Sequence, residues 1–184
     1  MGILTFSTNV TLDGCCDHRE GIADEELHDY YTQLVTDMGA MLFGRNTYEL
    51  MEEAWPSIAK DPNAPRSMKE WAVALEALPK YVVSTTRREY PWVNSFHLDG
   101  DLATAVKALK EKTPKGVGIG APKLATDLEK LGLIDEYRFV VHPILAGHGP
   151  TLVHGLERSR KLELIDVRRF KSGAMAMHYR RQPT

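Results

Sequence analysis

Short apolar segments alternate with amphipathic helical segments from residue 3 to residue 131, and this alternation restricts the fold more than any other feature of the sequence. Three strand-like segments then follow one another without a long helix between them. Such βα units followed by a strand meander predict an α/β fold, with a mostly parallel mixed sheet that has an antiparallel C-terminal edge. We expect strands at residues 3–10, 40–43, 81–84, 95–98, 116–120, 137–142, 161–170 and 174–180.

Capping residues, glycines and prolines mark the expected ends of the helices. Asp24 can cap a helix whose apolar positions recur at helical spacing until Gly39. The next helix begins near Arg45 and is expected to end before Pro56, because proline lacks the N–H group that continues a helix. The stretch 57–65 is then expected to be a surface loop. Further helices are expected at about 67–78, from 101, and at 122–131.

Length and composition fit a single domain over residues 1–184. The chain is 43% hydrophobic and 26% charged, which is ordinary for a globular protein. No segment has the roughly 18 consecutive apolar residues that span a bilayer, and the N-terminus lacks the pattern of a secretory signal. We therefore expect a cytoplasmic protein without a membrane partner. The net charge of −2 is spread along the chain, which argues against a nucleic-acid partner.

Cysteines and histidines give no pattern for a metal. Cys15 and Cys16 are adjacent, and neither belongs to the CxxC pairing that zinc sites use. His142, His148 and His154 lie within one stretch, but their spacing matches no established metal motif. We expect no metal site and interpret these histidines as residues of a pocket mouth or a dimer contact.

The first candidate ligand-binding loop follows the expected strand 40–43. Gly44 lets the backbone approach a ligand closely, and the helix that begins there offers unpaired N–H groups to a phosphate. Arg45 and Thr47 add side-chain donors. Taken alone, these residues also fit a structural turn with a surface arginine.

A second loop, residues 84–88, directly follows a buried strand. Hydroxyls and two arginines at this position suit a 2′-phosphate, the group that separates NADPH from NADH. An NAD-selective site favours a carboxylate here, and none occurs before Glu89. The competing interpretation of this loop is a solvated basic surface.

The third loop contains Gly118 and Gly120 and leads into a helix that starts with Pro122. Proline suits the first helical position, and the N–H groups of Lys123 and Leu124 remain available to a pyrophosphate. A bare GxG is a weak signal. Three such loops at the carboxyl ends of parallel strands nevertheless point to a nucleotide site, because open α/β sheets bind ligands at that edge.

The order and spacing of several motifs resemble the dihydrofolate-reductase-like family, in the branch that includes the reductase domain of bifunctional riboflavin-biosynthesis proteins. The resemblance covers nearly the whole chain and implies a three-layer dihydrofolate-reductase-like fold and a homodimer. The motifs that carry it are Thr11-Leu12-Asp13-Gly14, Gly44-Arg45-Asn46-Thr47-Tyr48-Glu49, Pro79-Lys80-Tyr81-Val82-Val83-Ser84, Gly120-Ala121-Pro122-Lys123-Leu124, Asp135-Glu136-Tyr137 and the stretch from His142 to Gly149.

The resemblance implies NADPH as the cofactor and assigns residues to its parts. One departure concerns Ala121, because dihydrofolate reductases have a second glycine there, so the cofactor affinity is in question. By resemblance, Arg45, Asn46 and Thr47 would hold the NADPH phosphates, Ser84, Thr85 and Arg87 the 2′-phosphate, Gly120, Ala121, Lys123 and Leu124 the pyrophosphate, and Thr8, Asn9, Asp13 and Gly14 would lie near the nicotinamide.

The proton donor is the least defined part of the expected site. Reduction of a C=N bond requires a proton as well as a hydride, and an acid near the substrate usually supplies it. The family's spacing leads back from Gly44 to His28, while a shift of one residue would present Asp29 instead. Asp13 is the third candidate. The alternative is that His28 and Asp29 are solvated helix residues.

These observations predict an NADPH-dependent reductase of a small heterocycle, either a pterin or a ribosylaminopyrimidine-like compound such as 5-amino-6-(5-phosphoribosylamino)uracil. The alternatives are a true dihydrofolate reductase and a non-catalytic NADP-binding protein. A deaminase activity is not expected, because the sequence has neither the HxE nor the PCxxC motif of zinc deaminases.

Overall fold

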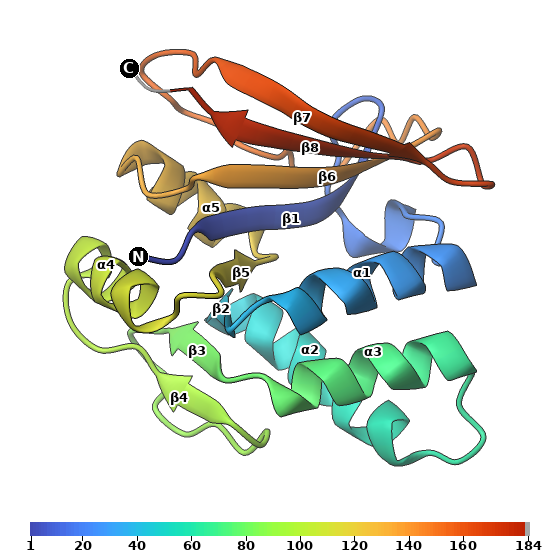
Figure 1. Cartoon of the computed structure of the whole chain (residues 1–184), viewed down its shortest axis with the longest axis horizontal. Coiled ribbons are helices and arrows are strands. Elements are labelled where there is room, and N and C mark those ends of the chain that lie inside the picture. Colours follow the sequence, from blue (N-terminus) through green and yellow to red (C-terminus); the bar gives the residue numbers. More distant parts are fainter. Residues whose placement is uncertain (183–184) are drawn as a thin grey trace.

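The first strand of the chain, β1 (Leu4–Thr11), lies in the middle of one eight-stranded sheet between two parallel neighbours (Figure 1). The computed structural model describes residues 1–182. In it the strands run in the order β4-β3-β2-β5-β1-β6-β8-β7. The other strands are β2 (Ala40–Gly44), β3 (Lys80–Val83), β4 (Ser95–His97), β5 (Val117–Ile119), β6 (Glu136–His142), β7 (Leu162–Arg169) and β8 (Met175–Arg181).

The mixed character of the sheet confirms the expected fold class. The five pairings from β4 to β6 are parallel, and β8 pairs antiparallel with both β6 and β7. A parallel connection needs a crossover, and the helices between the strands supply it. The last three strands form the antiparallel edge that the meander predicts.

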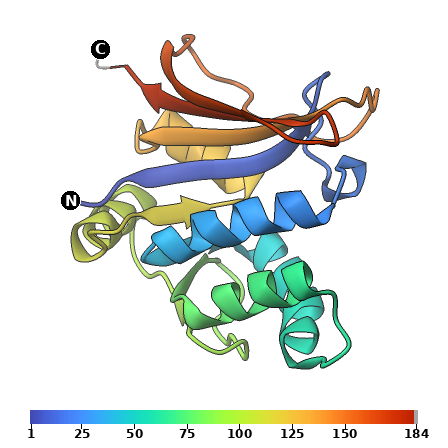
Figure 2. The ribbon, with the colours of Figure 1, turned by 45° about the vertical axis from the view of Figure 1, so that its right-hand side comes forward.

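Helices cover both faces of the sheet and bury three clusters of apolar residues, of which the smallest contains Leu27 and Val140. Leu124 and Leu128 pack with Phe6 under one face, whereas Val35, Tyr48 and neighbouring residues pack against β2 and β3 under the other. Figure 2 shows α1 and α3 side by side on the near face and α5 behind the strands. The helices are η1 (His18–Glu20), α1 (Glu25–Asp37), α2 (Arg45–Lys60), α3 (Arg66–Ala77), α4 (Leu102–Lys112) and α5 (Pro122–Lys130).

The predicted end of the second helix before Pro56 is wrong. α2 continues through Pro56 to Lys60, and α3 begins at Arg66. The loop between them is therefore 61–65, shorter than the expected loop 57–65. A proline inside a helix removes one backbone hydrogen bond but does not prevent the turn when tertiary contacts hold both sides. Trp55 supplies such a contact, because its ring meets Trp71 of α3 at a centroid distance of 6.0 Å.

The described residues, 1–182, contain neither a candidate membrane-spanning helix nor a candidate metal cluster. None of the helices there is long and apolar enough to cross a membrane. Over the same residues, no cluster of three or more histidine, cysteine, aspartate or glutamate side chains is arranged to hold a metal ion.

Candidate functional site

Two helices begin at neighbouring strand ends without a side-chain cap. The caps of α1 and α4 are aspartates whose carboxylates accept backbone N–H bonds, but α2 begins after Gly44 and α5 after Ala121, neither of which caps its helix. A Cβ on Gly44 would lie 3.7 Å from the Cβ of Leu124, so the two helix starts are close. Their first N–H groups are therefore available to an anion at one place on the carboxyl edge of the sheet.

The backbone at Ala121 fits alanine without strain. Its φ is −101° and its ψ is 101°, which is extended backbone open to any L-residue. Ala121 is also buried in the core under α5. The doubt about cofactor affinity that the missing second glycine raises therefore has no basis in the backbone conformation.

Arg45 and Thr86 meet above the ends of β2 and β3. The guanidinium Nη1 of Arg45 donates to Thr86 Oγ1 at 3.2 Å, and both side chains are exposed. Ser84 Oγ organises the same loop, because it accepts the backbone N–H groups of Thr86 at 3.2 Å and Arg87 at 2.9 Å. A solvent-facing guanidinium beside a hydroxyl is well suited to a phosphate.

Arg87, by contrast, is already paired. Its Nη2 lies 2.8 Å from a carboxylate oxygen of Glu52, and its Nε donates to the backbone oxygen of Glu89 at 2.8 Å. The guanidinium also lies over the rings of Tyr48 and Tyr90, at 5.1 and 5.5 Å from their centroids. Arg87 therefore fixes the loop, with its Nη2 engaged by Glu52 and its Nε by Glu89.

Gly118, predicted to contact the cofactor, has a packing role in this structure. It lies in β5, and a Cβ there would come 2.3 Å from the sulfur of Met38 and 2.6 Å from that of Met41. Only glycine lets α1 pack this closely on the sheet.

The remaining predicted cofactor residues lie on or next to these loops. Thr8 is half-buried on β1, where its hydroxyl donates to the backbone oxygen of Asn9. Gly120 follows β5, and a Cβ on it would lie 3.5 Å from the backbone oxygen of Ser7. The exposed or half-exposed positions at the strand ends are Asn46, Thr47, Thr85 and Lys123.

Asp13 connects two loops through its carboxylate. Its carboxylate accepts the backbone N–H groups of Ala146 at 3.1 Å and Gly147 at 2.6 Å, together with the hydroxyl of Thr11. These hydrogen bonds lower the pKa of Asp13 to about 2. The carboxylate thus holds the turn after β1 against the segment that follows β6. Gly14 follows it in the turn with φ +90°, a conformation that favours glycine.

Asp29 and His28 both have partners on the helices. Asp29 is exposed and its carboxylate lies 3.1 Å from Nη2 of Arg66, in α3. His28 Nδ1 lies 3.0 Å from the backbone oxygen of Asp24, and its ring meets Trp55 with centroids 6.3 Å apart. The surface ion pair directs Asp29 toward α3, so the structure gives no support to that carboxylate as the proton donor.

A polar group on the α1 face of β1 joins the predicted cofactor residue Asn9 to His142 and to Tyr31, and Tyr31 was not assigned to the site from sequence. Asn9 Oδ1 lies 3.1 Å from the hydroxyl of Tyr31 and 3.0 Å from Nε2 of His142. His142 is 1% exposed, and burial lowers its pKa. The signal in the sequence was the period of two along β1 and β6, which places Asn9 and His142 on the same face of adjacent strands.

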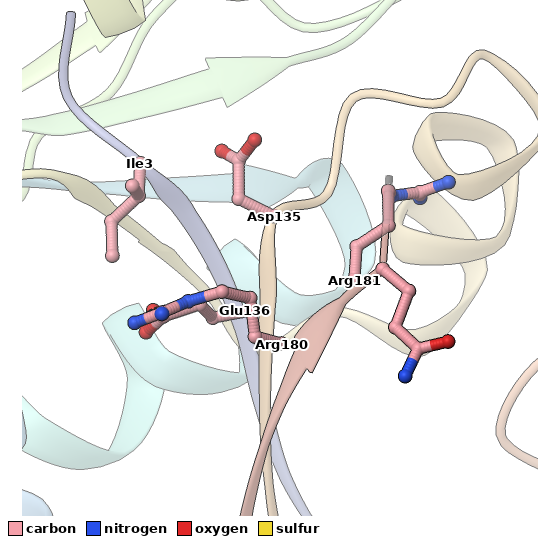
Figure 3. A pocket seen from close by; sticks show the side chains of 6 residues that line it. Ile3, Asp135, Glu136, Arg180 and Arg181 are labelled. Carbon is pink, nitrogen blue, oxygen red and sulfur yellow. Dashed lines mark hydrogen bonds and ion pairs between the residues drawn. The ribbon is translucent and has the colours of Figure 1, made fainter. Parts of the chain in front are cut away.

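Two hollows of the surface lie at the opposite edge of the sheet. One has a volume of about 250 Å³ and is bounded by the N-terminal ends of β1 and β6 and the end of β8 (Figure 3). Its charges are paired internally, since Glu136 lies 3.0 Å from Arg180 and 2.8 Å from His178. The carboxylate of Glu136 is thus held in ion pairs, and the uncapped helix starts lie on the other edge.

Comparison with known proteins gives relatives along the full length of the chain. The Bacillus subtilis (strain 168) protein named "Uncharacterized protein YyaP" is 27% identical over 174 residues, which cover 92% of this chain and 90% of that protein. The crystal structure of a putative riboflavin biosynthesis protein from Shewanella sp. PV-4 has a TM-score of 0.75 at 22% identity and covers 98% of this chain and 99% of that one.

A larger relative contains the same fold as one of its parts. The Thermotoga maritima diaminohydroxyphosphoribosylaminopyrimidine deaminase/5-amino-6-(5-phosphoribosylamino)uracil reductase has a TM-score of 0.68 at 18% identity; the match covers 98% of this chain and 57% of that chain. The family model of the RibD C-terminal domain matches residues 3–176. This chain therefore belongs to the RibD C-terminal domain family.

Proposed function

We propose that this protein is an NADPH-dependent reductase of a small heterocycle, similar to 5-amino-6-(5-phosphoribosylamino)uracil reductases. Membership of the RibD C-terminal domain family supports an oxidoreductase, and the name of the Thermotoga maritima relative supports a pyrimidine substrate. The observation that carries the proposal is the pair of uncapped helix starts at Gly44 and Ala121, beside the exposed Arg45.

The residues at this edge fit the anionic parts of NADPH. Arg45 and Thr86 would hold the 2′-phosphate, and the first N–H groups of α2 and α5 would hold the pyrophosphate. The strands lie in the order β3-β2-β5-β1, so NADPH with its phosphates at the ends of β3, β2 and β5 would place its nicotinamide next to β1. When bound, NADPH supplies the hydride of the reduction. The chain's own part is to hold the phosphates and to orient the two rings.

A titration of the purified protein with NADPH and with NADH, followed by cofactor fluorescence, tests the proposal. NADPH should bind more tightly than NADH. Arg45→Ala should weaken NADPH binding by about tenfold or more, because a charge-assisted contact with the 2′-phosphate contributes roughly 1.5–3 kcal/mol. It should leave NADH binding nearly unchanged.

Arg88→Ala is the matched control for this test. Arg88 is an exposed arginine of the same loop whose guanidinium lies 3.0 Å from Asp99, away from Thr86. Equal losses from both variants would show that only the general positive charge matters. Absence of binding of either nucleotide at millimolar concentration would remove the reductase proposal.

A second candidate function is NADP binding without turnover. It is favoured by the partners that Asp13 and Asp29 already have in this structure, namely the backbone N–H of Gly147 and the guanidinium of Arg66. The same observation weighs against a true dihydrofolate reductase, which needs an acid beside the pterin. His28 remains the candidate acid for turnover. NADPH oxidation assayed with dihydrofolate and with 5-amino-6-(5-phosphoribosylamino)uracil separates the three possibilities, since turnover of neither by a protein that binds NADPH leaves the binding function.

We also infer that the protein forms a homodimer through β7. This strand is the open edge of the sheet next to β8, and Leu164, Ile165 and Val167 on it are 52%, 39% and 39% exposed. Exposed apolar edge strands pair readily with another strand. Glu163 lies near one end of β7 and Arg169 at the other. In an antiparallel pairing of two β7 strands, the acidic end of one strand would therefore face the basic end of the other.

A further inference from the structure

The tautomer of His142 is fixed by a backbone group. The N–H of Ile22 points at Nδ1 of His142 with an N···N distance of 3.1 Å. A backbone N–H can only donate, so Nδ1 must accept and carries no proton. The buried, neutral imidazole then has its proton on Nε2. Ile22 lies between η1 and α1, so the segment before α1 determines the state of a histidine at the end of β6.

The tautomer of His142 in turn fixes the amide of Asn9. The Nε2–H group donates to the Asn9 side chain at 3.0 Å, and that atom must therefore be the oxygen Oδ1. The hydroxyl of Tyr31 donates to the same oxygen at 3.1 Å. Burial raises the pKa of Tyr31, so the phenol stays protonated and remains a donor. The reversed amide would place its NH₂ group against the Nε2–H donor.

The NH₂ group of Asn9 is left available. Within residues 1–182 the structure gives Nδ2 no hydrogen-bond partner, and the atom is not among the fully enclosed unpaired polar atoms of that part of the chain. Asn9 is half-buried near the carboxyl end of β1. The adjacent strand is β5, which leads into the uncapped start of α5. The free donor is thus one strand away from the proposed phosphate site.

We propose that Asn9 is a specificity-determining residue whose NH₂ group donates to an uncharged carbonyl oxygen on the ring ligand bound at the end of β1, and that His142 is its positioning residue. The identity of the ring rests on the function proposed above. A neutral donor held by two neutral groups suits a carbonyl oxygen better than a carboxylate or phosphate. A nicotinamide carboxamide and the carbonyl of a uracil both offer that oxygen.

Asn9→Asp is the sharpest test, because a carboxylate still accepts from Tyr31 and His142 but offers an acceptor where the wild type offers a donor. Three probes distinguish the sources of the carbonyl. Binding of adenosine 2′,5′-bisphosphate, which lacks the nicotinamide, should stay unchanged. If the carboxamide is the ligand, the variant should bind NADPH at least about tenfold more weakly. If the substrate is the ligand, NADPH binding should persist and kcat/KM for 5-amino-6-(5-phosphoribosylamino)uracil should fall at least about tenfold.

Asn63→Asp, at an exposed position of the loop after α2, is the matched control and should change none of these values. Unchanged NADPH affinity and kcat/KM in Asn9→Asp, with a wild type that binds NADPH, would overturn this inference alone. A wild type that binds neither nucleotide would remove the proposed function as well.

The positioning role of His142 has its own readout, which does not depend on a ligand or on the folding of Asn9→Asp. The ¹⁵N chemical shifts of the wild-type imidazole should show a protonated Nε2 and an unprotonated Nδ1. Among variants, His142→Gln retains an N–H donor toward Asn9 and should preserve ligand affinity better than His142→Leu. A proton on Nδ1, or equal losses in the two variants with unchanged thermal stability, would contradict the role.

Discussion

The side chain of Lys80 is buried, and its ammonium group still has hydrogen-bond partners. It is 0% exposed, and its Nζ donates to the backbone oxygens of Leu75 and Leu78 at 2.8 Å each and of Glu76 at 3.3 Å. The ammonium also lies 4.6 Å from the centroid of Trp92. It thereby satisfies the free carbonyl groups at the end of α3, as cations at helix C-termini do.

Replacing Lys80 by methionine should lower the free energy of unfolding by roughly 1–3 kcal/mol, because three buried or half-buried carbonyl groups lose their donor. Burial lowers the pKa of Lys80 from 10.5 to about 8. Between these values the unfolded chain binds more protons than the folded one, so the lysine's contribution to stability increases as the pH rises from 8 to 10.5.

Urea unfolding of both proteins at pH 7 and at pH 10 measures this contribution. The difference in stability between wild type and Lys80→Met should be larger at pH 10. A difference that shrinks on going to pH 10 would show that Lys80 is more easily protonated in the folded state than in the unfolded one.

At the residue scale, the sequence located the loops at the strand ends better than the contacts of the individual side chains within them. Gly44 and Arg45 lie where the motif places them, because a strand end and a helix start are local features. The pairing of Arg87 with Glu52 and of Asp29 with Arg66 depends on how α1, α2 and α3 pack, which no local pattern shows. The group formed by Asn9, Tyr31 and His142 is likewise assembled from three elements.

At the element scale, α2 remains helical although Pro56 lies inside it. Pro56 removes one backbone hydrogen bond from the helix interior, while the turns on both sides remain helical. The sequence predicted a helix end here because local propensity was weighed without the contact between α2 and α3. Tertiary packing overrides propensity at this position.

Pro56→Ala should therefore stabilise the protein. The alanine N–H can donate within the helix, and alanine is favoured over proline in a helix interior by about 3 kcal/mol, part of which is offset by lost packing of the half-buried ring. We expect an increase of roughly 1–2 kcal/mol in the free energy of unfolding, measured by urea denaturation. Ala54→Pro, at an exposed position of the same helix, should destabilise it; a loss of stability in Pro56→Ala would mean that the ring's packing outweighs the helix term.

The strand boundaries were predicted more accurately than the helix end. β1, β2 and β4 agree with their expected ranges within about a residue, since apolar runs bounded by turn residues define them. The order of the strands in the sheet, with β5 between β2 and β1, was not predicted from the sequence. The predicted fold class says which pairings are parallel or antiparallel, but it does not say which strands are neighbours.

At the scale of the whole molecule, the open edge at β7 makes the state of association testable. Leu164→Glu places a charge in the apolar strip formed by Leu164, Ile165 and Val167, so it should convert a dimer to a monomer in light scattering coupled to size exclusion. Leu145→Glu is the control, since Leu145 is 77% exposed and lies in the loop after β6. A wild type that is monomeric at micromolar concentration would contradict the dimer.

The central position of β1 determines when the sheet can be completed during synthesis. The ribosome delivers this strand before any of the others, yet its residues pair with Val117 of β5 and with Glu136 of β6, which leave the ribosome much later. Contacts between such distant parts of a chain form slowly. The early strand must therefore remain unpaired while most of the chain is translated, and a nascent chain stalled before residue 136 would expose an apolar strand edge to chaperones and to other unfinished copies.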